Sequence, residues 1–198
     1  MAGSILHFLE ALLREGPLQI GQVFVSTEFS LRNFEDAGRE GLKSFFNSAD
    51  AVEIAKYDDT GKYRPLKTAP NLRHGWILQL ETTQEVLIAL DYLYPAAIGT
   101  ALAVRQEQVV PINLRETLTR QSGMYAVVKR LTDDQANDLI KKTCHEGCLR
   151  KILWLISEER PAPLVEGNSP AFPIYCVEAC NLLVAAGRPV AKANPPVS

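Results

Sequence analysis

The chain has 198 residues, 46% of them hydrophobic, so it can bury a core as one large domain or two small ones. Its formal net charge of −2 argues against binding to nucleic acid or to an anionic membrane surface. Apolar runs stay below the roughly 18 residues of a membrane-spanning helix. The N-terminal stretch lacks a basic region and carries His7 and Glu10, so we expect no signal peptide and a cytoplasmic location.

The first half of the chain predicts helices on a small antiparallel sheet. Helical spacing of apolar residues, alternation and turn residues give the expected elements. Thr82 and Glu85 form a capping-box pattern, and Ser48 is expected to cap a segment that also fits a strand. The expected helices cover residues 4–15, 36–47, 82–92 and 95–107, the hairpin residues 18–26 and 29–34, and a further strand residues 76–80.

A basic loop is expected over residues 62–75. It contains Lys62, Arg64, Lys67, Arg73 and His74. A solvated loop is the favoured interpretation, and the alternative is an anion-binding role.

The second half predicts mainly helices. Asn113 is expected to cap a short helix, and a capping-box pattern at Thr132–Gln135 opens another that carries Cys144 near its end. A helical pattern resumes over residues 149–156, and a proline-containing loop follows over 161–173. The last helix is expected over 174–186, with Cys176 in its first turn, before a stop at Gly187 and Pro189.

The four cysteines of the chain form the strongest signal. They occur as two C-x₃-C pairs, Cys144/Cys148 and Cys176/Cys180. Residues four apart lie on the same face of a helix, so each pair can present two thiolates side by side. Two such pairs brought face to face predict a four-sulfur metal centre.

Two metals fit these pairs from spacing alone. Structural zinc takes four thiolates from pairs of similar spacing, whereas an iron–sulfur cluster needs more widely spread ligands and an apolar surrounding. Lys141, Lys142, Arg150 and Lys151 against Glu146 leave a local surplus of three positive charges, which offsets the −2 charge of a thiolate-bound [4Fe–4S]²⁺ cluster. We favour iron–sulfur, and zinc stays open. Disulfide-linked helical hairpins are the third interpretation. The expected cytoplasmic location is reducing, which disfavours disulfides.

No catalytic constellation is evident. His7 and His74 have no obvious partners, and His145 is expected to be an exposed residue or a donor to a sulfide. Nucleophile elbows, phosphate-binding loops and dinucleotide fingerprints are absent from the sequence.

Several motifs resemble the 4Fe-4S domain that accompanies sirohydrochlorin cobaltochelatase domains in some bacteria, and the N-terminal part resembles the stabilising domain that precedes it. The resemblance covers residues 5–187 and implies that all four cysteines bind a [4Fe-4S] cluster. The chelatase domain and its histidine pair have no counterpart here, so chelatase activity is not expected from this chain. The motifs are Tyr63-Arg-Pro-Leu66, Leu93-Tyr-Pro-Ala-Ala-Ile-Gly99, Glu116-Thr-Leu-Thr-Arg-Gln-Ser-Gly-Met-Tyr125, Cys144-x₃-Cys148-Leu-Arg-Lys-Ile-Leu-Trp154 and Glu178-Ala-Cys-Asn181.

These observations predict an α+β protein with an α+β stabilising region (1–110), a helical cluster-binding region (111–188) and a flexible tail (189–198). The expected function is [4Fe-4S] binding for electron transfer or redox sensing, with a redox or tetrapyrrole-pathway protein as partner. The alternative is an assembly module with a structural zinc. A weaker option is tetrapyrrole binding by the basic loop. The sequence does not specify an oligomeric state.

Overall fold

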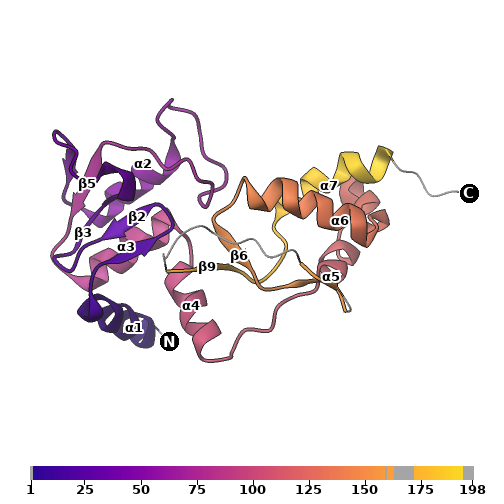
Figure 1. The fold of residues 1–198 in the computed structure, drawn as a ribbon, viewed down its shortest axis with the longest axis horizontal. Coiled ribbons are helices and arrows are strands. Elements are labelled where there is room, and N and C mark those ends of the chain that lie inside the picture. The colour runs from indigo at the N-terminus through magenta and orange to yellow at the C-terminus, as the bar shows by residue number, and fades with distance from the viewer. Residues whose placement is uncertain (1, 159, 163–171, 194–198) are drawn as a thin grey trace, which may run out of the picture. The chain divides into compact units, whose positions relative to one another are not determined.

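The computed structural model describes residues 2–158, 160–162 and 172–193. The chain forms two compact units. Unit 1 comprises Met1–Gln108 and Asn168–Ile174, and unit 2 comprises Val109–Gly167 and Tyr175–Ser198. Helices and strands occur in both units, as the predicted α+β class requires (Figure 1).

Unit 1 contains a five-stranded sheet in the order β1-β2-β3-β5-β4. The first four strands in this order pair antiparallel, as expected, but β4 pairs parallel with β5, so the sheet is mixed. The predicted pairing is confirmed for β2 and β3, but the single strand expected over residues 18–26 is divided into β1 and β2 by a hairpin turn with Gly21 at φ 53°. The strands are β1 (Leu18–Ile20), β2 (Val23–Val25), β3 (Ser30–Asn33), β4 (Lys43–Phe45) and β5 (Trp76–Gln79).

The helices of unit 1 follow the predicted caps closely. The Thr82–Glu85 capping box opens α3, and α3 packs against α1, α2 and α4. Asn47, one residue before the expected Ser48, caps the 3₁₀ segment that leads into α2. The elements are α1 (Ala2–Glu15), η1 (Phe34–Asp36), η2 (Ser48–Asp50), α2 (Ala51–Lys56), α3 (Thr83–Leu93) and α4 (Ala97–Arg105).

The helix predicted over residues 36–47 is wrong. The structure has η1, a turn and β4 there. Gly38 and Gly41 adopt φ values of 75° and 71°, which a right-handed helix does not allow.

Tyr94 explains why a glycine is needed in the first hairpin turn. The Tyr94 side chain is fully buried, and its hydroxyl accepts a hydrogen bond from Gln22 N at 2.9 Å. A Cβ atom on Gly21 would lie 2.9 Å from the Tyr94 ring and hydroxyl, a distance at which the ring must shift. The hairpin and the end of α3 therefore fit together only with glycine at position 21.

The helical part of unit 2 begins with the predicted Asn113 cap, whose side chain accepts a hydrogen bond from Arg115 N. The capping box at Thr132 and Gln135 is also confirmed. In Figure 1, α6 and α7 lie side by side within this unit. The elements are α5 (Leu114–Thr119), η3 (Gly123–Arg130), α6 (Asp133–Ile140), η4 (Lys141–His145) and α7 (Asn181–Ala193).

Unit 2 is less helical than predicted. The helical pattern over residues 149–156 is realised as strands, and residues 174–176 form a strand rather than the first turn of the last helix. Strand β6 pairs with β9, and β7 pairs with β8. Most of the expected loop over 161–173 lies outside the described residues. The strands are β6 (Arg150–Ile152), β7 (Leu155–Ser157), β8 (Arg160–Pro161) and β9 (Ile174–Cys176).

Helix α7 begins later and ends later than expected. It starts at Asn181 and passes through Gly187 and Pro189 to Ala193, so residues 189–193 are helical rather than a flexible tail. Residues 194–198 lie outside the described part. Gly187 is buried, and a Cβ atom there would lie 2.9 Å from Leu131 Cδ1. The glycine is therefore a contact point of the helix within unit 2 and not its stop.

Within the described residues, no single helix is long and apolar enough to cross a bilayer. Helices α3 and α4 meet the length and composition criteria only when combined, and a bend of 101° separates them.

Candidate metal centre

The four cysteines all belong to unit 2 and lie at the ends of regular elements. Cys144 lies in the π-helical turn η4 that continues α6, and Cys148 follows that turn. Cys176 is the last residue of β9, and Cys180 directly precedes α7. Neither pair therefore lies on one continuous helix face. This differs from the prediction that each pair presents its two thiolates on the same face of a helix. Cys180, and not Cys176, is the cysteine next to the last helix.

The first pair is held in a tight turn. Cys148 N donates to Cys144 O at 3.2 Å, so the backbone keeps an i to i+4 hydrogen bond across the pair. A Cβ atom on Gly147 would lie 2.6 Å from Thr143 O, closer than real Cβ atoms approach a backbone oxygen. The turn around the first pair therefore requires glycine at position 147.

The second pair is anchored through its backbone. Leu153 N donates to Cys176 O, and Ile112 N donates to Val177 O, each at 3.0 Å. Beyond the pair, Val184 N donates to Cys180 O at 3.2 Å in the first turn of α7. Segments on both sides of the first pair thus hold the start of the second pair, and the first turn of α7 holds its end.

A side chain inside the second pair adds a further anchor. The Glu178 carboxylate forms an ion pair with Arg120 and lies 3.5 Å from Thr117 Oγ1. Thr117 lies on α5, and Arg120 directly follows that helix, so the interaction ties the C-x₃-C segment to α5.

Burial raises the pKa of two of the thiols, Cys144 and Cys176. The pKa of the Cys144 thiol is raised to about 12, first by burial and then by the thiols of the other three cysteines. Burial also raises the pKa of Cys176, against the opposing effects of a hydrogen bond from Trp154 and the charge of Arg150. Deprotonation therefore requires a compensating positive charge, which a bound metal supplies.

The donor set fits an iron–sulfur cluster in type and number. None of the four cysteines is in a disulfide; Cys180 is exposed and the other three are half-buried. Cys144 and Cys176 pack against the hydrophobic core of unit 2, which provides the apolar shield that such clusters need. In the described part of the chain, however, no three His, Cys, Asp or Glu side chains are arranged to hold a metal ion. The thiols lie within electrostatic range of one another without converging on one point.

The predicted positive charges near the cysteines are unequal in effect. Lys141, Lys142 and Lys151 are exposed, whereas Arg150 is half-buried and lowers the pKa of Cys176. His145 is exposed. Arg150 is therefore the cation of this group that acts on a cysteine.

Several basic side chains of the loop over residues 62–75 form hydrogen bonds or ion pairs within unit 1. Arg64 is 1% exposed and donates to three backbone carbonyls and to Asn71 Oδ1. Lys67 Nζ donates to Ala55 O at 3.0 Å. His74 lies between two carboxylates, 2.6 Å from Asp59 and 3.1 Å from Glu35. His74 thus has two acidic partners that the sequence did not suggest.

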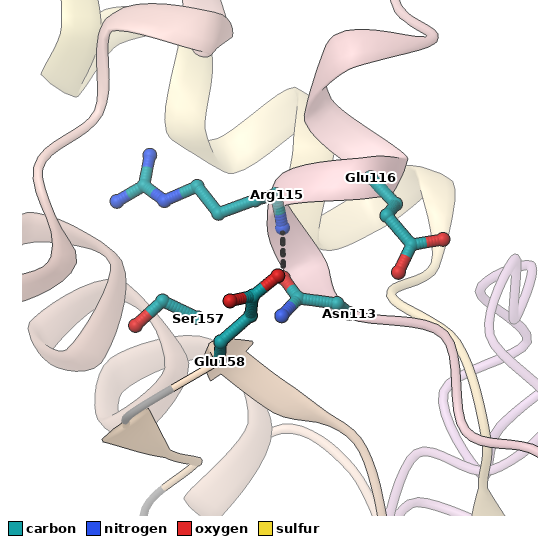
Figure 2. Close-up of a pocket in the computed structure, with 5 residues that line it drawn as sticks. All are labelled: Asn113, Arg115, Glu116, Ser157 and Glu158. Atoms are coloured by element: carbon teal, nitrogen blue, oxygen red, sulfur yellow. Dashed lines mark hydrogen bonds between the residues drawn. The ribbon is translucent and has the colours of Figure 1, made fainter.

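A pocket of about 430 Å³ lies elsewhere in unit 2 and contains no cysteine (Figure 2). Two of its lining side chains have partners: Asn113 caps α5, as the dashed line in Figure 2 shows, and Arg115 pairs with Asp133. The pocket is lined by Asn113, Arg115, Glu116, Ser157 and Glu158.

Sequence reasoning assigned no role to three residues around the cysteines. Trp154 donates its indole N–H to Cys176 Sγ at 3.3 Å, and Arg120 and Glu178 form the anchor described above. All three lie inside the motifs that carried the family resemblance, but only the structure shows what they contact.

Two family models match consecutive parts of the chain. Residues 7–105 match the family model of the DR2241 stabilising domain, and residues 106–189 match that of a 4Fe-4S iron-sulfur cluster binding domain. The second range includes all four cysteines. No curated protein matches the chain.

A solved structure also matches. It is DR2241 from Deinococcus radiodurans, described as a multi-domain protein with structural similarity to chelatases and with two additional novel domains. The TM-score is 0.82 at 26% sequence identity, over 97% of the present chain and 42% of DR2241. The chain thus spans less than half the length of that protein.

Proposed function

The chain belongs to the DR2241 stabilising-domain family and carries a 4Fe-4S cluster-binding domain, and from this premise we propose that it is a redox protein. Its cluster is held by Cys144, Cys148, Cys176 and Cys180 and serves electron transfer or redox sensing. The supporting observation is that the only four cysteines lie in the cluster-binding domain, where the other three raise the pKa of Cys144.

The surroundings of the cysteines suit this role. A [4Fe-4S] cluster, when bound, supplies one-electron transfer. The core of unit 2 covers part of Cys144 and Cys176, and Arg150 offsets negative charge near Cys176. Cys180 is exposed, so one ligand lies at the surface, where an electron can be exchanged with a partner protein. The four cysteines form no disulfide, which fits a reducing compartment, and we place the protein in the cytoplasm.

A structural zinc in an assembly module is the second candidate. It is supported by the four-thiol donor set, which zinc also accepts. Under this alternative the centre is redox-silent, and replacing any one ligand unfolds unit 2.

The link to tetrapyrrole chemistry belongs to the proposal as well. DR2241 resembles chelatases, and the present chain spans only part of its length. We therefore place the partner among proteins of tetrapyrrole metabolism, with this chain as the electron-transferring or sensing component. Binding of the tetrapyrrole by the basic loop has less support, because Arg64, Lys67 and His74 are engaged within unit 1.

A spectroelectrochemical titration of the anaerobically purified chain tests the redox role. We expect reversible reduction by one electron per cluster. The loss of visible absorbance and the EPR signal both monitor this reduction. A colourless protein with one zinc and no reducible centre would support the assembly module instead. Titration with a porphyrin separately tests the tetrapyrrole-binding option, and we expect no binding to the basic loop.

A further inference from the structure

Trp154 lies against one of the four cysteines. Its indole Nε1 is 3.3 Å from Cys176 Sγ, and the residue is only 2% exposed. The preceding residue donates its own backbone N–H to Cys176 O at 3.0 Å. Two hydrogen bonds from adjacent residues therefore hold Trp154 at Cys176.

The sulfur is a weak acceptor as a thiol and a much better one when it carries negative charge. A buried indole N–H without a partner is destabilising, so a buried tryptophan at this place needs an acceptor. As a thiol, Cys176 also donates to Glu178 O at 3.1 Å. Loss of the thiol proton removes that bond but leaves the bond from Trp154, which gains strength.

We propose that the indole N–H of Trp154 stabilises negative charge on Cys176 Sγ and thereby raises the reduction potential of the cluster. This inference rests on the proposed function. Reduction adds one negative charge that is shared with the thiolate ligands, and a hydrogen bond to sulfur favours the more negative state. Trp154 is a positioning and tuning residue that has no direct role in carrying the electron.

The chain provides a matched control. Its other tryptophan, Trp76, is also fully buried, and it donates its indole N–H to Arg73 O at 2.7 Å in unit 1. Trp76→Phe and Trp154→Phe therefore remove the same group from two equally buried sites, but only the second touches a cysteine.

The first measurement is the reduction potential of the anaerobic, cluster-loaded chain. We expect Trp154→Phe to lower the equilibrium constant for reduction about tenfold, equivalent to 59 mV for a one-electron couple, and Trp76→Phe to leave it unchanged. The sign separates this effect from a packing defect. Water that enters a cavity stabilises the more negative state and raises the potential, whereas loss of a donor lowers it.

The second measurement uses the metal-free full chain and needs no cluster. With ¹⁵N-labelled tryptophan, we expect Cys176→Ser to move the indole N–H signal of Trp154 and leave that of Trp76 in place. Cys180→Ser is the control, because the two indole N–H groups of the chain donate to Cys176 and to Arg73 O and not to Cys180. This arm keeps the inference testable if Trp154→Phe does not fold.

The outcomes separate the inference from the proposed function. A wild-type chain that takes up no iron overturns both. A loaded chain whose potential is unchanged or raised in Trp154→Phe overturns the inference alone. An indole signal of Trp154 that does not respond to Cys176→Ser also overturns the inference, whatever the metal content.

Discussion

Arg120 and Glu178 form the contact that ties the second cysteine pair to α5. Both side chains are partly exposed, at 54% and 40%, so their ion pair contributes only about 0.5 kcal/mol. We expect Glu178→Gln and Arg120→Met each to speed loss of the cluster to an iron chelator about twofold. The rate of bleaching under anaerobic conditions measures this.

The double variant is the control for that prediction. Because the two side chains act through one contact, the double variant is expected to lose its cluster no faster than either single variant. Additive effects would show that the two residues act independently.

His74 gives unit 1 a dependence on pH. Hydrogen bonds to Asp59 and then Glu35 raise the pKa of His74 against the effect of burial. The stabilisation is fully present below the unfolded pKa of about 6.5 and is lost as pH rises through the higher folded pKa. We expect unit 1 to lose about 0.5 kcal/mol over that range.

Urea unfolding of the Trp154→Phe variant, monitored by the fluorescence of Trp76, measures this loss of stability as a function of pH. His74→Gln cannot hold the positive charge, so its stability is expected to be flat over the same pH range. A wild-type stability that rises through this range would contradict the assignment.

At the scale of elements, Gly147 determines whether the first cysteine turn forms. A Cβ atom at this position would lie 2.6 Å from Thr143 O, against backbone that cannot rotate away. We expect Gly147→Ala to destabilise unit 2 by about 2 kcal/mol and to reduce cluster occupancy. Denaturant unfolding and iron content measure the two effects.

Gly99 on α4 is the matched control for that substitution. A Cβ atom there would lie 3.4 Å from Ile5 Cδ1, an ordinary contact with the end of a flexible side chain. Alanine is favoured over glycine in a helix, so Gly99→Ala is expected to be neutral or stabilising. Equal losses in both variants would contradict the role of the Gly147 turn.

The caps of α3, α5 and α6 could be predicted because a cap depends on a few neighbouring residues. The strands β6 and β9 could not, because their pairing joins segments on either side of residues 153–173. Leu149, Ile152 and Ile156 fit a helical period equally well, and only the partner strand decides. The prediction therefore placed Cys176 in the first turn of a helix, whereas in the structure it is the last residue of β9.

The candidate ligands were named from the sequence, whereas the residues that surround them could not be predicted from it. Two C-x₃-C pairs identify four candidate ligands from the sequence. The contacts of Trp154 and Arg120 depend on how unit 2 packs, and no local pattern encodes them.

On the scale of the whole molecule, the two units have different dependence on the metal. The hydrophobic core of unit 2 includes Trp154 and packs against Cys144 and Cys176, whereas Trp76 reports on unit 1. We expect removal of the cluster to lower the unfolding midpoint of unit 2 and not of unit 1.

Emission from two single-tryptophan variants reads the units separately: Trp76→Phe reports unit 2 and Trp154→Phe reports unit 1. Midpoints that fall together after chelation would show that the metal supports the whole chain rather than unit 2.

The most direct test of the account is the iron and acid-labile sulfide content of the anaerobically purified chain. We predict about four iron and four sulfide per wild-type chain, and neither in the variant with serine at positions 144, 148, 176 and 180. One zinc without sulfide in the wild type, or full iron content in the serine variant, would contradict the assignment.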